Sequence, residues 1–146
     1  MTALYEYRFT RHRVADVRSR TISGAEGMHA VFAESFADLG VEHLKVAVLN
    51  ARNTVIGIET VYIGNVTGTT VRIGDLFRAA IRLDGVSIVI AHNHPSGDPT
   101  PSPDDLHMTA EAVAAGRLLD IPVRDHIIIA DDDWTSLRDR GVAFER

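Results

Sequence analysis

The stretch HNHPSGDPTPSPDD, residues 92–105, holds four of the five prolines and two of the seven histidines of the chain. It follows an almost continuous apolar run at 86–91, which is typical of a strand that is covered on both faces. Apolar residues recur at helical spacing after it, from Leu106 onward. A stiff polar loop between a buried strand and a helix is where α/β proteins place functional groups, so we expect the chemistry of this chain here.

Two histidines at the end of the expected strand can bind one metal ion. Side chains alternate across a strand, so His92 and His94 should point to the same side, about 6.6 Å apart at the backbone. A catalytic zinc ion takes three protein ligands, typically histidine and carboxylate, and keeps one position for water. Asp105, at the start of the next helix, is the best candidate for the third ligand, and Asp98 and Asp104 are its competitors.

Helix capping is an alternative explanation of the same loop. Ser102, Pro103 and Asp105 form a good helix start, with Ser102 as the N-cap, proline at the first helical position and Asp105 at the third. A histidine pair at this spacing also arises by chance in a chain with seven histidines. The prolines favour a metal site, because they restrict the unfolded loop and a metal site requires a preformed one.

Composition excludes several kinds of site and location. The chain has 146 residues and a net charge of −5, with 45% apolar and 24% charged residues, so we expect one globular domain over 1–146 with its core at about 25–141. The absence of cysteine excludes disulfides, thiolate metal sites and cysteine nucleophiles. No apolar run approaches the ~20 residues of a membrane span, and the N-terminus lacks the apolar core of a secretion signal. We therefore expect a cytoplasmic protein without membrane contact.

One basic segment departs from this acidic balance. A solvated edge strand and turn is its first interpretation, and contact with nucleic acid or an acidic partner is the second. The negative net charge argues mildly against a dedicated nucleic-acid binder. The segment spans residues 8–20 and contains a single aspartate and five arginines: Arg8, Arg11, Arg13, Arg18 and Arg20.

Hydrophobic periodicity predicts an α/β (α+β) fold, a mixed β-sheet flanked by helices. Ser23 and Glu26 match a capping box at the start of the first helix, and Asp75 can cap the second. Residues 41–63 should form a hairpin, and residues 131–133 a turn. Strands are expected over 2–9, 41–49, 54–63, 66–73, 86–91 and 123–130, and helices over 23–40, 75–85 and 102–119.

The loop resembles the JAMM metalloprotease motif, in which two histidines one residue apart are followed by ten residues and an aspartate, with serine three positions before it. His92, His94, Ser102 and Asp105 match it without a gap. The sequence of the loop is still more similar to that of the RadC family, the bacterial JAB/MPN-like group. Three further segments also resemble this family: LNARN at 49–53, Gly-Thr at 68–69 and DHIII at 125–129. The resemblance covers about 25–141 and implies the JAB/MPN, cytidine-deaminase-like architecture. Larger RadC proteins carry an N-terminal helix-hairpin-helix region, and this chain is expected to be the short form without it.

The resemblance also implies a zinc-dependent protease in which these two histidines and the aspartate hold Zn²⁺. A metal-activated water would then attack a peptide or isopeptide bond of a polypeptide substrate. Glu42, at the start of the strand after the first helix, is the implied general base, and Glu59 is its competitor. Ser102 is the implied hydrogen-bond donor to the developing oxyanion.

Other functions fit parts of the same sequence. Two histidines and a carboxylate could hold iron in an oxygenase, but the JAMM spacing favours a hydrolase. A zinc deaminase requires cysteine ligands, which the chain lacks. A non-catalytic, metal-stabilised module that associates with DNA is the remaining alternative, implied by the family's link with DNA repair and supported here only by the basic segment. His126, in a predicted strand, is expected to be a core histidine.

Overall fold

The computed structural model describes all residues except 7, 9–20, 38, 65–70 and 145–146. The expected first strand over 2–9 is wrong for its described part, since residues 2–6 and 8 have no regular secondary structure. A strand requires a neighbouring strand for its backbone hydrogen bonds, and no described strand pairs with these residues. Most of the basic segment, including Arg11, Arg13, Arg18 and Arg20, lies outside the described residues.

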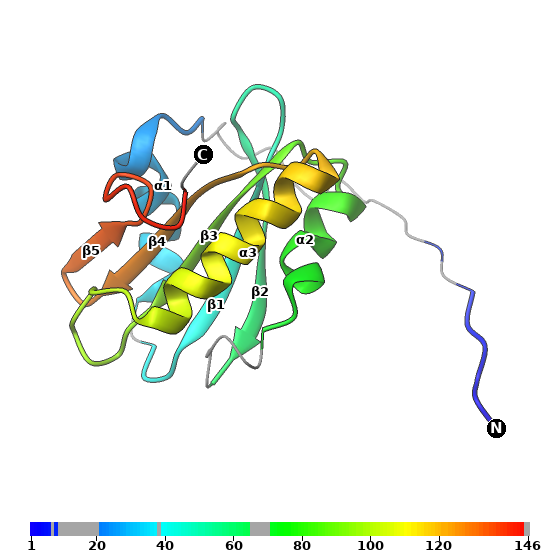
Figure 1. The fold of residues 1–146 in the computed structure, drawn as a ribbon, viewed down its shortest axis with the longest axis horizontal. Helices are drawn as coiled ribbons and strands as arrows, with labels where there is room; N and C mark the ends of the chain where they lie inside the picture. The colour runs from blue at the N-terminus through cyan, green and yellow to red at the C-terminus, as the bar shows by residue number, and fades with distance from the viewer. Residues whose placement is uncertain (7, 9–20, 38, 65–70, 145–146) are drawn as a thin grey trace.

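A five-stranded mixed sheet forms the centre of the fold, in the strand order β2-β1-β3-β4-β5 (Figure 1). β3 and β4 run parallel, and the other neighbouring pairs are antiparallel. This arrangement confirms the predicted α+β class and the hairpin of β1 and β2. The elements in chain order are α1 (Gly24–Ala33), the 3₁₀ helix η1 (Glu34–Phe36), β1 (His43–Leu49), β2 (Val55–Ile63), α2 (Ile73–Arg82), β3 (Ser87–Asn93), α3 (Pro103–Leu119), β4 (Val123–Ala130) and β5 (Asp133–Ser136).

Helices cover both faces of the sheet, which explains why every residue of β3 is buried. Helices α2 and α3 pack on one face, as Figure 1 shows, and α1 packs on the other. Successive strand residues alternate between the two cores: Ile88 and Ile90 face α2 and α3, whereas Val89 and Ala91 face α1. The site at the end of β3 therefore stands on the most enclosed strand of the sheet.

The first helix is shorter than predicted. It changes to a 3₁₀ turn at Glu34 and ends at Phe36, although Met28, Val31 and Phe32 are buried as the periodicity indicated. Ser23 is the N-cap, but its side chain makes no capping hydrogen bond, so the predicted capping box is wrong. Gly24 has φ +68°, in the left-handed region, so the backbone from Ser23 to Glu26 does not follow the path that a capping box requires.

Two other predicted boundaries are wrong. The strand over 66–73 lies mostly outside the described residues, and Ile73 is the first residue of α2, whose N-cap is Arg72 rather than Asp75. Asp75 instead accepts a hydrogen bond from the Tyr62 hydroxyl at 2.5 Å, which ties α2 to β2. Residues 131–132 form the expected turn, but it leads into β5, whose Trp134 pairs with Ile129. The four residues of β5, Asp-Trp-Thr-Ser, include one apolar residue, so they show no alternation of apolar and polar residues.

No helix among the described residues is both long and apolar enough to cross a bilayer.

Candidate metal centre

The candidate centre lies where β3 ends and α3 begins. His92 pairs with Leu44 of β1 on one side and with Ile128 of β4 on the other, so strands on both sides hold its backbone. Its side chain is 1% exposed, and the side chain of Asp105, in the first turn of α3, is 6% exposed. His94, just beyond the strand, is partly exposed. The structure thus brings together the three residues predicted as ligands, with His92 in β3, Asp105 in α3 and His94 in the loop between them.

The ligand atoms lie close enough to share one ion. His92 Nε2 lies 2.8 Å from His94 Nε2, and Asp105 places Oδ1 3.3 Å from the first and Oδ2 3.2 Å from the second. Zinc binds such ligands at ~2.0–2.2 Å in a tetrahedron, which puts neighbouring ligand atoms about 3.3–3.5 Å apart. The two nitrogen-to-oxygen distances already match this spacing, and the nitrogen pair needs to separate by about 0.5 Å. The donor set therefore fits a small divalent cation.

The N-terminal cap of α3 includes the candidate ligand Asp105. Ser102 Oγ accepts a hydrogen bond from the Asp105 backbone N–H at 3.1 Å, and Asp105 Oδ2 accepts one from the Ser102 backbone N–H at 2.8 Å. Pro103 occupies the first helical position, as predicted. This capping box fixes the orientation of the Asp105 carboxylate. Capping and metal binding are therefore compatible explanations of the loop.

Electrostatics hold Asp105 ionised. Burial alone would raise the pKa of this carboxyl, but its contacts with the imidazoles of His92 and His94 outweigh burial and keep the pKa well below its ordinary value. The hydrogen bond to Asp105 likewise raises the pKa of His94 against burial, and the charge of Glu42 adds a smaller contribution. The centre therefore presents an ionised carboxylate, which can bind a cation.

His126 is buried, as expected for a core histidine, but its ring also contacts the site. Its Nε2 lies 2.6 Å from His92 Nδ1, and its Nδ1 lies 2.6 Å from Thr109 Oγ1 on α3. Burial, reinforced by His92, lowers the pKa of His126 well below its ordinary value. No local sequence signal linked Thr109 or His126 to the ligands, because their contact depends on the packing of α3 and β4.

The two candidate bases occupy different surroundings. Glu42, the predicted base, directly precedes β1, and its charge reaches His94. Glu59, its competitor, lies in β2 and accepts hydrogen bonds from the Arg78 guanidinium of α2, the shorter at 2.7 Å. The contact with Arg78 directs Glu59 toward α2, whereas the charge of Glu42 acts on His94, so the surroundings favour Glu42.

Asn93, between the two histidines, holds the segment that carries Glu42. Its Oδ1 accepts a hydrogen bond from His43 N at 2.7 Å, and its Nδ2 donates one to Val41 O at 3.0 Å. The Asn93 side chain thus forms hydrogen bonds with the backbone on both sides of Glu42. Sequence reasoning missed this role, although a buried asparagine always needs partners, which was the available signal.

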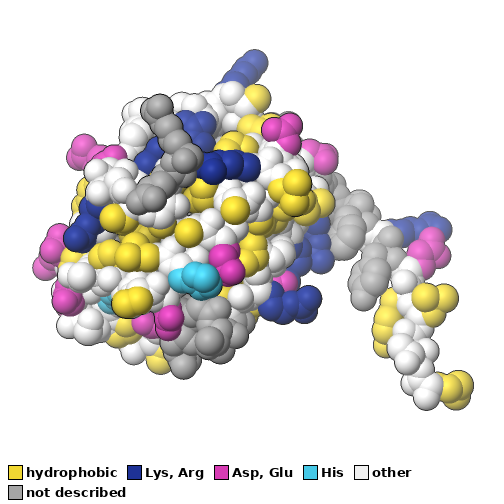
Figure 2. Space-filling model, viewed as in Figure 1, with side chains coloured by type: hydrophobic (Ala, Val, Ile, Leu, Met, Phe, Trp, Pro, Cys, Tyr) yellow, Lys and Arg dark blue, Asp and Glu magenta, His cyan; other side chains and the backbone are white. Residues whose placement is uncertain are grey.

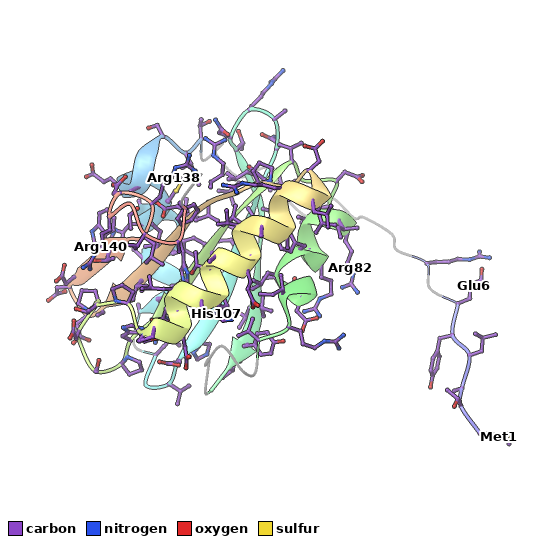
Figure 3. All side chains as sticks on the ribbon, in the orientation of Figure 1. Met1, Glu6, Arg82, His107, Arg138 and Arg140 are labelled. Atoms are coloured by element: carbon purple, nitrogen blue, oxygen red, sulfur yellow. The ribbon has the colours of Figure 1, made fainter. Side chains whose placement is uncertain are left out.

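The competing aspartates lie outside the ligand cluster. Asp98 is exposed, and its Oδ1 accepts a hydrogen bond from Thr100 N at 2.9 Å, while its backbone carbonyl lies 2.8 Å from His94 Nδ1. Asp104 is exposed. His107, labelled in Figure 3 near the start of α3, is also exposed and lies 3.4 Å from Glu111. Among the described residues, the group that could hold a metal is His92, His94 and Asp105.

An open groove of about 780 Å³ adjoins the centre. His94 lines it and also belongs to the ligand set, so the groove and the metal site share a wall. One side is formed by α1 and the segment after it, and the other by the loops that follow the parallel strands β3 and β4. Its lining includes His29, Phe36, Leu39, Pro95, Ile129, Asp131 and Asp132.

Comparison with known proteins agrees with this geometry. The family model described as "RadC-like JAB domain" matches residues 22–142. A protein of Chloroflexus aggregans named "UPF0758 protein" is 47% identical over 116 residues, which is 80% of this chain and 51% of that protein. A "UPF0758 protein" of Roseiflexus castenholzii is 50% identical over 106 residues, 73% of this chain and 46% of the relative. The chain spans about half the length of these curated relatives.

Proposed function

Because the chain belongs to the RadC family of JAB-domain proteins, we propose that it is a zinc-dependent hydrolase of the JAMM type that cleaves peptide or isopeptide bonds. The observation that carries the proposal is the convergence of His92, His94 and Asp105 at one point beside an open groove. Two imidazoles and one carboxylate are a ligand set of catalytic zinc sites, which leaves a coordination position for water.

Zinc fits this donor set better than the hard cations. Magnesium and calcium prefer ligand sets built of oxygen atoms, whereas the cluster offers two nitrogens and a carboxylate. When bound, zinc activates water as a nucleophile and polarises the scissile carbonyl. The ionised Asp105 would hold the ion with the two histidines, and the cap at Ser102 keeps that carboxylate aimed at it.

Glu42 and Ser102 supply the proton chemistry in this proposal. Glu42 would accept the proton of the attacking water and return it to the leaving amine, as a general base and then a general acid. Ser102 uses an oxygen lone pair in the cap, so its hydroxyl proton remains available to donate to the carbonyl oxygen. Such a donor is typically worth about 3 kcal/mol in the transition state.

The groove gives a polypeptide substrate access to the centre. Its walls combine apolar side chains such as Phe36 and Ile129 with polar groups at His29, Asp131 and Asp132. An extended peptide that lies along these walls would pass His94. We therefore propose that the substrate binds in this groove, with the scissile carbonyl near the capping end of α3.

The alternative function, a non-catalytic module bound to DNA, depends on a basic surface. On the face seen in Figure 2, Lys and Arg side chains are interspersed with acidic and apolar ones. Most of the arginine-rich segment lies outside the described residues. The described surface in this view thus offers no support for the alternative beyond the sequence itself.

Cleavage assays with the zinc-loaded chain test the proposal. Linear peptides and lysine-branched isopeptides, each carrying a fluorophore and a quencher, would be compared for wild type, Glu42→Gln and Glu59→Gln. We expect hydrolysis by wild type and by Glu59→Gln, and loss of hydrolysis in Glu42→Gln with zinc retained. Fully zinc-loaded wild type that cleaves neither substrate class would contradict the enzymatic function. Equal hydrolysis rates for the two glutamine variants would contradict only the assignment of Glu42 as the base and would leave the enzymatic function standing.

A further inference from the structure

We propose that Thr109 and His126 set the tautomer of His92, so that His92 Nε2 carries its lone pair toward the metal site before a metal binds. Both would be positioning residues, because neither touches the ion or the substrate. The inference rests on the proposed metal site. It is carried by a chain of three contacts of 2.6 Å that link the Asp105 carbonyl to Thr109, His126 and His92 Nδ1, and the donor and acceptor of each contact can be assigned.

The backbone carbonyl of Asp105 can only accept a hydrogen bond, and this fixes the direction of the first contact. Thr109 Oγ1 lies 2.6 Å from Asp105 O, and two oxygens this close require a proton between them. The Thr109 hydroxyl has one proton and must donate it there. At its other contact, 2.6 Å from His126 Nδ1, the hydroxyl oxygen can therefore only accept. His126 consequently carries a proton on Nδ1.

The proton position on His126 in turn fixes the proton position on His92. His126 is 0% exposed, and an enclosed imidazole without a carboxylate partner is neutral. With its proton on Nδ1, its Nε2 is a bare acceptor. The contact of 2.6 Å with His92 Nδ1 is then a hydrogen bond that His92 donates. In the neutral imidazole, which is the form that binds a metal, His92 Nε2 is then left as a lone pair directed at His94 and Asp105.

A hydrogen bond to the backbone sets the tautomer of His94 in the same way. His94 Nδ1 lies 2.8 Å from the backbone carbonyl of Asp98, which can only accept, so this nitrogen carries a proton. Both histidines thus keep Nδ1 protonated and leave Nε2 to face the carboxylate. Two nitrogen lone pairs 2.8 Å apart beside a carboxylate repel each other, and a metal ion bound between them removes this repulsion.

Removing the Thr109 hydroxyl should reverse the donor and acceptor roles of His126 and His92. In Thr109→Val, His126 Nδ1–H has no acceptor in a buried position, which favours the other tautomer, with the proton on Nε2. His126 would then donate to His92 Nδ1 and move the His92 proton onto Nε2, inside the metal site. Loss of such an outer partner typically weakens metal binding by about 10–100-fold. Thr109→Ser keeps the hydroxyl and is the matched control.

The experiment combines zinc affinity with ring tautomers. Zinc affinity of wild type, Thr109→Val and Thr109→Ser would be measured by competition with a chromophoric chelator. Long-range ¹⁵N–¹H correlation spectra of the metal-free protein would report which ring nitrogen of His92, His94 and His126 carries the proton. We expect an Nδ1 proton in all three rings, an affinity at least 10-fold lower in Thr109→Val, and near-wild-type affinity in Thr109→Ser.

The possible failures are distinguishable. Equal zinc affinities for Thr109→Val and wild type, or a His92 ring protonated only on Nε2 in the metal-free wild type, would overturn the inference. Wild type that binds no zinc would instead contradict the proposed function, and the tautomer of His92 would still decide the inference. If Thr109→Val does not fold, the spectra of wild type and Thr109→Ser provide the test.

Discussion

Replacing Asn93 with alanine should release the segment that carries Glu42 while leaving the metal ligands in place. The Asn93 side chain accepts from His43 N at 2.7 Å and donates to Val41 O at 3.0 Å, so it holds the residues on both sides of Glu42. Neither hydrogen bond involves a ligand atom. The variant therefore separates the placement of the general base from the binding of the metal.

The expected magnitude follows from these two hydrogen bonds. A typical intramolecular hydrogen bond contributes a net ~1 kcal/mol, and both hydrogen bonds of the Asn93 side chain are partly buried. Asn93→Ala should therefore lower the free energy of unfolding by about 2 kcal/mol. For a chain of 146 residues this corresponds to a fall of roughly 4–8 °C in Tm. A displacement of Glu42 by about 1 Å should lower kcat on the order of 100-fold.

Urea denaturation, chelator competition and peptide hydrolysis would be measured for Asn93→Ala and for a matched control, Asn50→Ala. Asn50 Oδ1 also accepts two backbone hydrogen bonds, from Arg52 N at 2.9 Å and Thr54 N at 3.1 Å, but it lies in the β1–β2 turn. Both variants should lose stability, and only Asn93→Ala should lose turnover, with zinc affinity kept. Equal turnover in the two variants, or loss of zinc from Asn93→Ala, would refute the reasoning.

Three further predictions test the fold and the cap. Gly116→Ala should lower the free energy of unfolding by about 1–3 kcal/mol, since its Cβ would lie 2.6 Å from Ile121 O. Gly74→Ala, whose Cβ would have no atom within 4 Å, should raise the free energy of unfolding by up to ~1 kcal/mol. Urea denaturation that gives the same shift for both variants would be inconsistent with this packing. Burial raises the pKa of Asp125 above 3.8, so its contribution to stability is present at low pH and lost as pH rises through the folded-state pKa. Across the pH range around the folded-state pKa, the free energy of unfolding of Asp125→Asn should rise relative to that of wild type as pH increases. A difference in stability that stays constant with pH would contradict this prediction. Ser102→Ala should lose about 1 kcal/mol and roughly 100-fold in turnover, and Ser102→Thr should retain the cap; thermal melts in which the alanine variant matches wild type would exclude the capping role.

Local patterns were sufficient to predict the two elements that hold the ligands. The apolar run before His92 marks a strand that is covered on both faces, and β3 is buried throughout. Ser102 and Pro103 specify the start of α3 within four residues, so the position of Asp105 followed from capping chemistry alone. These signals are short in range, and no distant contact needed to be known to interpret them.

The support around the ligands could not be predicted in this way. His126 reaches His92 because β4 pairs in parallel with β3, with Ile90 opposite His126, a register that no local pattern specifies. Thr109 joins them only through the packing of α3 on that sheet. The hold of Asn93 on the segment around Glu42 likewise connects residues about fifty positions apart. Boundaries failed where a conformation was local but unusual, as at Gly24 with its positive φ.

The most direct test of the metal centre is the zinc content of the purified chain, measured by inductively coupled plasma mass spectrometry for wild type and His92→Ala. His92 supplies a buried ligand atom from the central part of the sheet, so its loss leaves two ligands and a destabilised site. We predict one zinc ion per chain in wild type and almost none in His92→Ala, with both proteins folded by circular dichroism. Wild type without zinc after incubation with the metal, or a full equivalent retained by His92→Ala, would contradict the metal centre.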